Sequence, residues 1–466
     1  MNAINKQYVN DIHSKLNRTK VCEIVKPEST EDIQTSVKKA ISAGESISVA
    51  GGFHAMGGQQ FLNGGILLDM SNMNRVLKFE PEQELIRVEG GIKWDELVAY
   101  TVSTQTDAEN QVGIRQKQTG ADRLSIGGAL SANIHGRGLQ MKPFIGDVES
   151  FRIVTASGEI LNCSRRENPE LFRLAVGGYG LFGIIASATI RLAKRRKVRR
   201  SVKIELVENL DSLFTARINE NFLYGDFQFA IAPESEDFLR KGVFSCYLPV
   251  SNEMPTESNR ELSAEEWRNL LFLAHVNKQK AFELYAAHYL ATDGQIYWSD
   301  THQLSVYLDN YHEELDQKLN AKNPSSEMIT EIYISLTSLP DFLERVRKDF
   351  RENQVELIYG TIRLIKRDDE SFLAWAREDF ACIIFNLHIE HSSAGFEKAK
   401  TDFQRLIDRS IEFGGSFYLT YHRWATKKQI SACYSQFADF LSLKIKFDAG
   451  EVFQSDWYCY FKKMFD

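Results

Sequence analysis

Residues 51–59 read GGFHAMGGQ, and they follow a short apolar run, residues 47–50, that has the pattern of a strand. Four glycines let backbone N–H groups converge on an anion at little steric cost, which is how a pyrophosphate is held. The spacing matches neither G-x-G-x-x-G nor a Walker loop, so those two nucleotide-binding signatures are absent. Taken alone, the segment is explained more simply as a pair of tight turns.

Two further glycine-rich segments change this balance. Residues 120–138 read GADRLSIGGALSANIHGRG, and residues 177–185 read GGYGLFGII. Small residues let the main chain lie flat against a large rigid ligand, and Ser125, Ser131 and Asn133 offer additional hydrogen bonds. Three such clusters in one region are hard to explain as turns alone.

Helices and strands alternate around these segments. Residues 29–32 have the pattern of a capping box, which predicts a helix that begins there and ends at Gly44. The other predicted elements of this region are strands over residues 66–69, 85–89 and 184–192 and helices over residues 94–100 and 170–176.

The basic run at residues 194–200, KRRKVRR, marks a change of sequence character. We interpret it as a solvated linker, with peripheral contact to anionic lipid as the minor alternative. Beyond it, long alternating runs predict an antiparallel sheet with helices on one face. The expected strands cover residues 227–231, 243–248, 331–336, 355–365, 382–390 and 417–421. Near the C-terminus we expect a helix over residues 429–443 and an aromatic ending, residues 453–458, that docks on the rest of the chain.

Composition limits the class of protein. The 466 residues predict about three domains, or two large ones, at ~150 residues each. With 43% hydrophobic and 26% charged residues the chain is expected to be globular, which excludes disordered, collagen-like and coiled-coil proteins. A net charge of −7 argues against a nucleic-acid partner.

The cysteines and the hydropathy give expectations about compartment. Six cysteines without a C-x-x-C pair argue against a zinc site and a disulfide framework, and they favour the reducing cytoplasm. No apolar window reaches roughly 18 residues and the N-terminus has no apolar core, so neither membrane spanning nor secretion is expected.

The three glycine-rich motifs, in this order, resemble those of the FAD-linked oxidases of the vanillyl-alcohol oxidase family, which share a PCMH-type FAD-binding domain. Residues 51–59 resemble the first pyrophosphate loop, residues 124–138 the second FAD segment, and residues 170–185 the closing helix and strand. Within the family, the resemblance is greatest to decaprenylphosphoryl-ribose oxidases, sugar-alcohol oxidases and aldonolactone oxidases.

The resemblance implies an α+β fold in three parts. A two-subdomain PCMH-type FAD-binding domain is expected at residues 1–195, and a substrate (cap) domain, an antiparallel sheet with helices on one face, at residues 196–424. Residues 425–466 would dock back on the FAD domain. The cofactor implied is FAD, and no metal is implied. Its expected binding residues are Gly51, Gly52, His54, Ala55, Met56, Gly57, Gly58, Gln59, Gly120, Ser125, Gly127, Gly128, Ser131, Asn133, His135 and Ile184.

His54 occupies the place where many relatives bind FAD covalently through a histidine ring nitrogen. Gln59 matches the glutamine that follows this histidine in cytokinin dehydrogenases, whereas Phe53 replaces the usual glycine. We predict a single histidyl bond, with a hydrogen-bonding histidine in the phosphate loop as the alternative. Residues 120–138 contain no cysteine, so a second covalent bond is not expected.

Enzymes of this family pass a hydride from a C–H that carries an alcohol or amine to flavin N5, and the protein must handle a proton. Arg363 lies where sugar-alcohol oxidases keep a basic substrate residue, although Thr361 replaces the acid that normally accompanies it. Tyr421 and His422 fall near the place of a catalytic lysine in relatives, and either side chain can supply an acid–base group.

Further candidates come from strand alternation and from the second glycine-rich segment. Asn386, His388 and Glu390 share one strand face, which lines either a sugar-like pocket or solvent. His135 either acts in the site or holds its loop by hydrogen bonds, and Glu331, with Tyr333, faces either the same cavity or solvent. The predicted catalytic residues are Tyr421, His422, Arg363, His135 and His388.

The function expected from the sequence is an FAD-dependent oxidoreductase that oxidises a hydroxylated small molecule: a sugar, alditol, lactone or lipid-linked sugar. A flavin-dependent C=C reductase of the same fold and a non-catalytic flavin-binding partner protein are the alternatives. The electron acceptor stays open between oxygen and another molecule. No nucleic acid and at most a peripheral membrane contact are expected.

Overall fold

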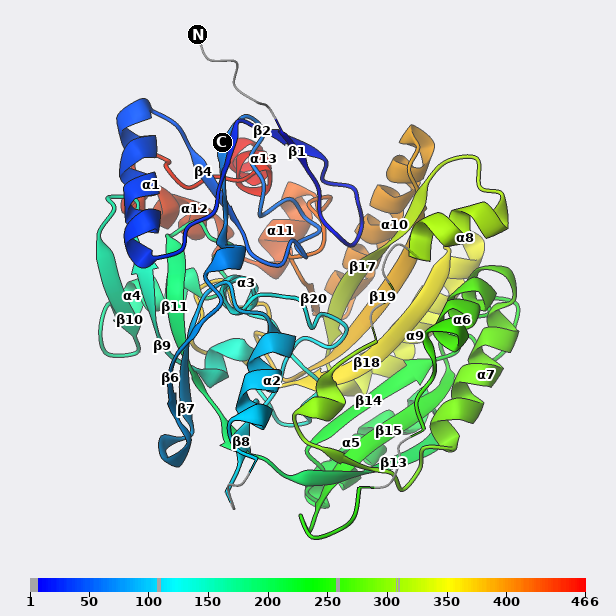
Figure 1. The fold of residues 1–466 in the computed structure, drawn as a ribbon. Helices are drawn as coiled ribbons and strands as arrows, with labels where there is room; N and C mark the ends of the chain where they lie inside the picture. The colour runs from blue at the N-terminus through cyan, green and yellow to red at the C-terminus, as the bar shows by residue number, and fades with distance from the viewer. Residues whose placement is uncertain (1–6, 107–109, 257–259, 307, 309–310) are drawn as a thin grey trace.

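The structure is a computed structural model that describes residues 7–106, 110–256, 260–306, 308 and 311–466. Figure 1 shows two parts side by side: the helices and smaller sheets built mainly from the N-terminal third, and a large antiparallel sheet from the middle of the chain. Helices and mostly antiparallel sheets make this an α+β fold, as expected.

The first sheet contains three short parallel strands in the order β3 (Glu23–Val25), β5 (Ile66–Asp69) and β4 (Ile47–Ala50). Helix α1 (Thr30–Ala43) connects β3 to β4. The side chain of Ser29 accepts a hydrogen bond from the Asp32 N–H at its start, and Gly44 ends it in the left-handed conformation. The predicted helix and both predicted strands are confirmed.

The second sheet has five antiparallel strands. Their order is β10 (Ile160–Ser164), β9 (Val148–Val154), β11 (Ile184–Arg191), β7 (Leu85–Glu89) and β6 (Val76–Glu80). Strands β7 and β11 were predicted, whereas β6, β9 and β10 were not. Helices α2 (Trp94–Ser103), α3 (Ile126–Ala132) and α4 (Pro169–Ala175) accompany this sheet, and α2 and α4 match the predicted helices.

The third sheet has eight strands with antiparallel neighbours. Their order is β16 (Ile296–Trp298), β13 (Lys197–Leu206), β15 (Lys241–Val250), β14 (Tyr224–Phe229), β18 (Leu357–Ile365), β19 (Phe380–Glu390), β17 (Ser325–Ile334) and β20 (Ser416–Phe417). The predicted antiparallel sheet is confirmed. Strand β20 ends earlier than predicted, so Tyr421 lies in the loop that follows it.

Helices cover both faces of this sheet, so the prediction of helices on one face is wrong. Phe385 of β19 packs against Phe350 of α9, whereas His388 of the same strand contacts His275 of α6. Strand alternation places these two side chains on opposite faces. Helices α5 (Leu210–Asn219), α9 (Leu339–Glu352) and α10 (Ser393–Glu412) lie on one face, and α6 (Ala264–Val276), α7 (Lys278–Leu290) and α8 (Tyr311–Leu319) on the other.

The basic run at residues 194–200 is part of two strands, so its interpretation as a solvated linker is wrong. Strand β12 (Ala193–Lys194) pairs with β8 (Val112–Gly113), and β13 begins at Lys197. Arg195 is buried, and its Nε donates to both carboxylate oxygens of Asp300 at 3.0 and 2.8 Å. Asp300 compensates the charge of buried Arg195, whereas Lys194, Arg196 and Arg199 of the same run stay exposed.

The C-terminal residues pack against the N-terminal sheet. The Ile47 N–H donates to Val452 O at 2.6 Å, and the ring of buried Trp457 lies 4.8 Å from that of Tyr179. Three helices form this end of the chain, α11 (Lys427–Cys433), α12 (Phe437–Phe447) and α13 (Asp456–Phe465), so the single predicted helix is two helices. A short hairpin of β1 (Gln7–Val9) and β2 (Thr19–Val21) completes the fold.

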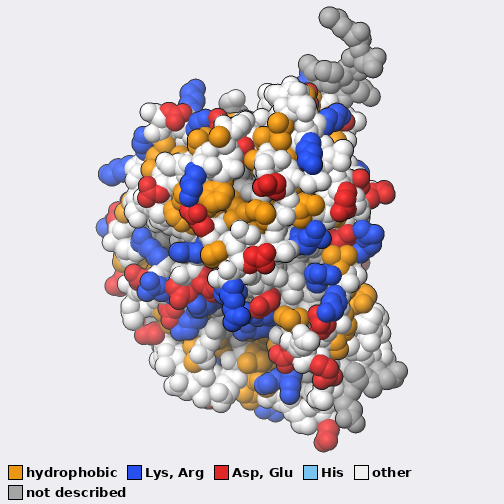
Figure 2. All heavy atoms as spheres, turned by 90° about the vertical axis from the view of Figure 1, so that its left-hand side faces the viewer, with side chains coloured by type: hydrophobic (Ala, Val, Ile, Leu, Met, Phe, Trp, Pro, Cys, Tyr) orange, Lys and Arg blue, Asp and Glu red, His pale blue; other side chains and the backbone are white. Residues whose placement is uncertain are grey.

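Among the described residues, no helix is long and apolar enough to cross a membrane. Figure 2 shows lysine and arginine side chains mingled with aspartate and glutamate over the face that carries α1, with small hydrophobic areas between them.

Candidate functional site

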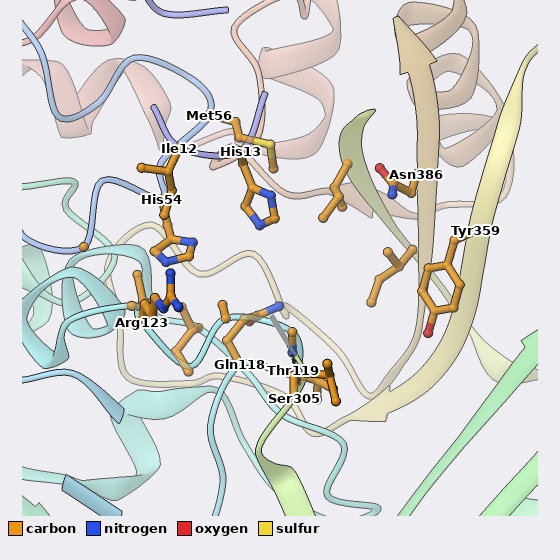
Figure 3. A pocket seen from close by; sticks show the side chains of 18 of the residues that line it. Ile12, His13, His54, Met56, Gln118, Thr119, Arg123, Ser305, Tyr359 and Asn386 are labelled. Atoms are coloured by element: carbon orange, nitrogen blue, oxygen red, sulfur yellow. Dashed lines mark hydrogen bonds between the residues drawn. The ribbon is translucent and has the colours of Figure 1, made fainter. Parts of the chain in front are cut away.

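A cavity of about 1540 Å³ lies between the glycine-rich segments and the large sheet. Figure 3 shows His54, His13 and Arg123 on one side of it and Tyr359 and Asn386 on the other, where they project from strands of the sheet. Pockets for drug-sized ligands have volumes of roughly 300–1,000 Å³. The cavity therefore has room for a large cofactor together with a small substrate.

Glycine is required where the loops of this cavity meet. A Cβ on Gly51 would lie 2.0 Å from Ser125 Oγ, and one on Gly52 would lie 2.2 Å from the Arg123 carbonyl oxygen. A Cβ on Gly127 would lie 2.9 Å from the carbonyl oxygen of Gly90. The first two glycine-rich segments are thus pressed together, and their backbone forms a wall on which a flat ligand can lie.

Most of the predicted cofactor residues line this cavity. They are Gly51, Gly52, His54, Ala55, Met56, Gln59, Gly120, Ser125, Gly127, Gly128, Ser131 and Ile184. Gly57, Gly58, Asn133 and His135 do not. The Asn133 side chain donates to Asp368 at 2.9 Å and accepts from the Ile145 N–H at 3.0 Å, so it holds its loop within the protein.

His54 is buried in the cavity wall, and its ring centroid lies 5.4 Å from that of His13. Burial, reinforced by His13 and Arg123, holds the pKa of His54 well below its usual value, so the ring is neutral at pH 7. Phe53 adopts a φ of 58° and packs toward Phe61, with ring centroids 6.0 Å apart. Phe53 therefore does not displace His54 from the cavity.

A buried carboxylate, Glu331 of β17, lies on the sheet side of the cavity. The Tyr421 hydroxyl donates to its Oε1 at 2.8 Å and the Tyr333 hydroxyl to its Oε2 at 2.9 Å, while His135 Nε2 lies 2.9 Å from Oε2. Burial alone would raise the pKa of Glu331. His135 and Arg363 outweigh this effect and lower that pKa to about 2, so the carboxylate is ionised.

The environment of Tyr421 raises the pKa of its side chain, whereas that of Glu331 lowers it. Burial, together with the charge of Glu331, raises the pKa of Tyr421 well above its usual value. The phenol therefore keeps its proton at neutral pH and donates it to Glu331. Gln118 Nε2 donates to the phenol oxygen at 3.4 Å, and the sequence analysis did not identify this glutamine.

Arg363 of β18 lines the same cavity and is only 4% exposed. Its Nε and Nη1 atoms are buried without a hydrogen-bond partner, as are Thr361 Oγ1 and Asn386 Oδ1. A buried unsatisfied polar group costs roughly 1–3 kcal/mol, more when it is charged. Arg363 and Asn386 line the cavity, so a polar ligand there would find partners in their unused groups.

Two predicted catalytic residues are not among the residues that line the cavity, so the cavity does not support their assignment. His422 stacks on Phe403 of α10, with ring centroids 4.6 Å apart, and burial lowers its pKa to about 3. His388 points toward α6.

His135 does not line the cavity either. It lies behind Glu331, with its Nδ1 3.0 Å from Gly136 O. Tyr421 and Arg363 are the predicted catalytic residues that line the cavity.

Comparison with known proteins identifies the N-terminal part. Residues 23–164 match the sequence family described as an FAD binding domain. The chain carries an FAD-binding domain. Its cofactor is FAD, and the predicted PCMH-type FAD-binding domain is confirmed.

The relatives match about two fifths of the chain. The chain is 34% identical over 182 residues to an uncharacterized oxidoreductase, ORF5 in the fasciation locus of Rhodococcoides fascians, covering 39% of this chain and 40% of that protein. It is 30% identical over 177 residues to cytokinin dehydrogenase 1 of Arabidopsis thaliana, covering 36% and 29%. L-gulono-1,4-lactone dehydrogenase of Mycobacterium tuberculosis is 28% identical over 209 residues, covering 44% and 46%. Each match spans less than half of the relative.

The FAD-binding domain fits FAD at the glycine-rich wall. The matched residues include the first two glycine-rich segments. Side chains in place of their glycines would collide with the neighbouring backbone and side chains. The third segment lies outside the matched residues, yet Tyr179, Gly180 and Ile184 line the same cavity. Sequence reasoning named Ile184 but not Tyr179, Arg123 or Gln118, because no local pattern distinguishes such residues from their neighbours.

Proposed function

We propose that this protein is an FAD-dependent oxidoreductase that oxidises a CH–OH group of a small hydroxylated molecule. The observation that carries the proposal is the position of Tyr421, Glu331 and Arg363, which line the same cavity as the glycine-rich wall of the FAD-binding domain. An acid–base pair and an arginine with unused donors are the groups that this oxidation needs from the protein.

The glycine-rich segments would hold the cofactor, with Gly51, Gly52, Gly127 and Gly128 in contact with it. Bound FAD supplies the hydride acceptor. His54 lines the cavity with a neutral ring, which supports covalent attachment of the flavin through one of its nitrogens.

Arg363 would bind and orient the substrate hydroxyl. Its charge stabilises the oxygen as the O–H proton leaves. That proton passes to the Tyr421 oxygen while the phenol proton passes to Glu331 Oε1, 2.8 Å away. The low pKa of Glu331 means that the carboxylate releases this proton readily and returns to its resting form.

The polar groups of the sheet wall support a hydroxyl-rich substrate. Arg363, Thr361 and Asn386 present buried polar atoms without partners, and all three lie on neighbouring strands β18 and β19. Sugars, alditols and aldonolactones offer several hydroxyl or carbonyl oxygens at such spacing. The lactone dehydrogenase among the relatives is consistent with this class.

The test is anaerobic reduction of the bound flavin. The purified protein is mixed with a panel of alditols, aldoses and aldonolactones, and loss of flavin absorbance is followed by stopped flow. We expect at least one compound to reduce the flavin, and Tyr421→Phe to slow that reduction by roughly 10²–10⁴-fold. His422→Phe is the matched control, because this neighbouring side chain faces α10 and should leave the rate unchanged. A flavin that no member of the panel reduces would contradict the proposal.

A further inference from the structure

A second cluster of ionisable side chains lies on the same sheet, away from Glu331. His275 of α6, Glu327 of β17 and His388 of β19 each offer one ligand atom, and these atoms all lie within 4.8 Å of one another. Glu327 is four residues before Glu331 on the same strand face, roughly 13 Å away at ~3.3 Å per residue. The two carboxylates therefore belong to separate centres.

The contacts in this cluster are short but are not hydrogen bonds. His275 Nε2 lies 3.2 Å from Glu327 Oε1, and His312 Nδ1 of α8 lies 3.0 Å from Oε2. His275 Nε2, His312 Nδ1, Glu327 Oε1 and His388 Nδ1 are nevertheless buried without a hydrogen-bond partner. Buried polar atoms are almost always paired, so a group of four that are not calls for another kind of partner.

The orientation of His275 indicates what that partner is. Its Nδ1 lies 2.8 Å from the carbonyl oxygen of Leu271, which can only accept, so Nδ1 carries the hydrogen. In the neutral ring Nε2 then presents a lone pair to the carboxylate of Glu327. Two electron-rich atoms 3.2 Å apart need either a bound cation or a proton on Nε2 between them. A ring N–H held by a backbone carbonyl is also how proteins orient a metal-binding histidine.

The two carboxylate oxygens of Glu327 face different groups. The Tyr311 hydroxyl donates to Oε2, which leaves Oε1 facing His275.

We propose that His275, Glu327 and His388 bind a divalent transition-metal ion, with zinc as the expected metal. Two imidazoles and one carboxylate form a donor set that zinc uses, at ~2.0–2.2 Å from each ligand. Two ligands on a tetrahedral ion of that size are about 3.3 Å apart, close to the contact between His275 and Glu327. The ligand atom of His388 lies within 4.8 Å of the other two.

The ion would connect α6 to two strands of the sheet beside the substrate cavity. His312 and Tyr311, which hold the second carboxylate oxygen, both line that cavity. Three protein ligands leave a fourth position on a tetrahedral ion. The alternative is a protonated His275 that forms an ion pair with Glu327 and binds no metal.

The test is zinc binding by the full-length, FAD-loaded protein. After treatment with a chelator and gel filtration, the protein is titrated with Zn²⁺ by calorimetry, and metal retained after a second gel filtration is measured by elemental analysis. We expect one equivalent of zinc to bind and to raise the thermal unfolding midpoint. His312→Gln should weaken binding by roughly 10–100-fold, because this residue orients the carboxylate.

Ligand variants locate the site. Glu327→Gln and His388→Gln should abolish the binding, whereas His288→Gln on α7, outside the cluster, should leave it unchanged. Flavin content and circular dichroism of each variant report whether it has folded. The proposal would be overturned if the unmutated protein retained no zinc. It would also be overturned if Glu327→Gln and His388→Gln bound zinc as well as the unmutated protein does. Neither readout uses enzyme activity, so the result does not depend on the proposed oxidoreductase function.

Discussion

Replacement of Glu331 by glutamine tests whether the buried centre of the proposed active site is ionised. The variant keeps the size of the side chain but removes its charge. One pKa step corresponds to ~1.4 kcal/mol, so lowering the pKa of Glu331 from 4.5 to about 2 contributes ~3 kcal/mol to the stability of the folded state at pH 7. Because Glu331 is fully buried, solvent does not screen this contribution.

The contribution depends on pH in a defined direction. The folded-state pKa of Glu331 is lower than its usual value, so the stabilisation is complete above about pH 5 and is lost as the pH falls toward about 2. The difference in the free energy of unfolding between the unmutated protein and Glu331→Gln should therefore be ~3 kcal/mol at pH 7 and shrink steadily in acid. Contributions from other carboxylates cancel in this difference.

Urea unfolding of the FAD-loaded protein, followed by tryptophan fluorescence between pH 7 and pH 3, measures the difference. Glu82→Gln on the exposed surface is the matched control and should change the stability by less than about 0.5 kcal/mol at every pH. A Glu331→Gln difference that stays constant from pH 7 to pH 3 would refute the reasoning, because it would mean that folding does not change the pKa of Glu331.

Three other changes probe the cofactor and substrate sides of the cavity. Gly127→Leu should lose FAD while the large sheet stays folded, because even a Cβ at this position lies 2.9 Å from a backbone oxygen. Gly450→Ala is the control: its added Cβ meets the nearest neighbouring atom at 3.7 Å, so this variant should keep full flavin absorbance. Arg363→Met should leave the flavin spectrum intact but slow flavin reduction by at least 10²-fold, and an unchanged stopped-flow rate would place the substrate elsewhere. Acid precipitation should leave yellow colour and added flavin mass with the unmutated protein and remove both from His54→Ala; flavin released entirely from the unmutated protein would exclude covalent attachment.

Local sequence was sufficient for the elements that depend on local interactions. Helix α1 begins at the Ser29 cap and ends at Gly44 because the caps are properties of single residues. The glycine-rich segments were recognisable because a backbone wall leaves no room for side chains. Strands β9 and β10 were not predicted, although the β-branched and aromatic residues of β9 (VESFRIV) are typical of a strand.

Local sequence could not decide between a buried and a solvent-exposed position where a pattern fits both. Strand alternation grouped Asn386 with His388 correctly, but it could not say that only Asn386 lines the cavity. The basic run at residues 194–200 was interpreted as solvated, since its buried partner Asp300 comes from a distant part of the chain. Helices were placed on one face of the large sheet because its strands do not reveal that both of their faces are buried.

The sequence by itself determined the FAD-binding domain, most of the residues that line the cofactor side of the cavity, and the antiparallel character of the large sheet. These features follow from backbone conformation and periodicity, which neighbouring residues set. Only the tertiary structure decided which polar side chains are buried together. Glu331 meets Tyr421 and His135, and Glu327 meets His275 and His388, across long stretches of chain. Burial and charge pairing are properties of the packed chain, so these two centres and their chemistry emerge only when the sheet and its helices assemble.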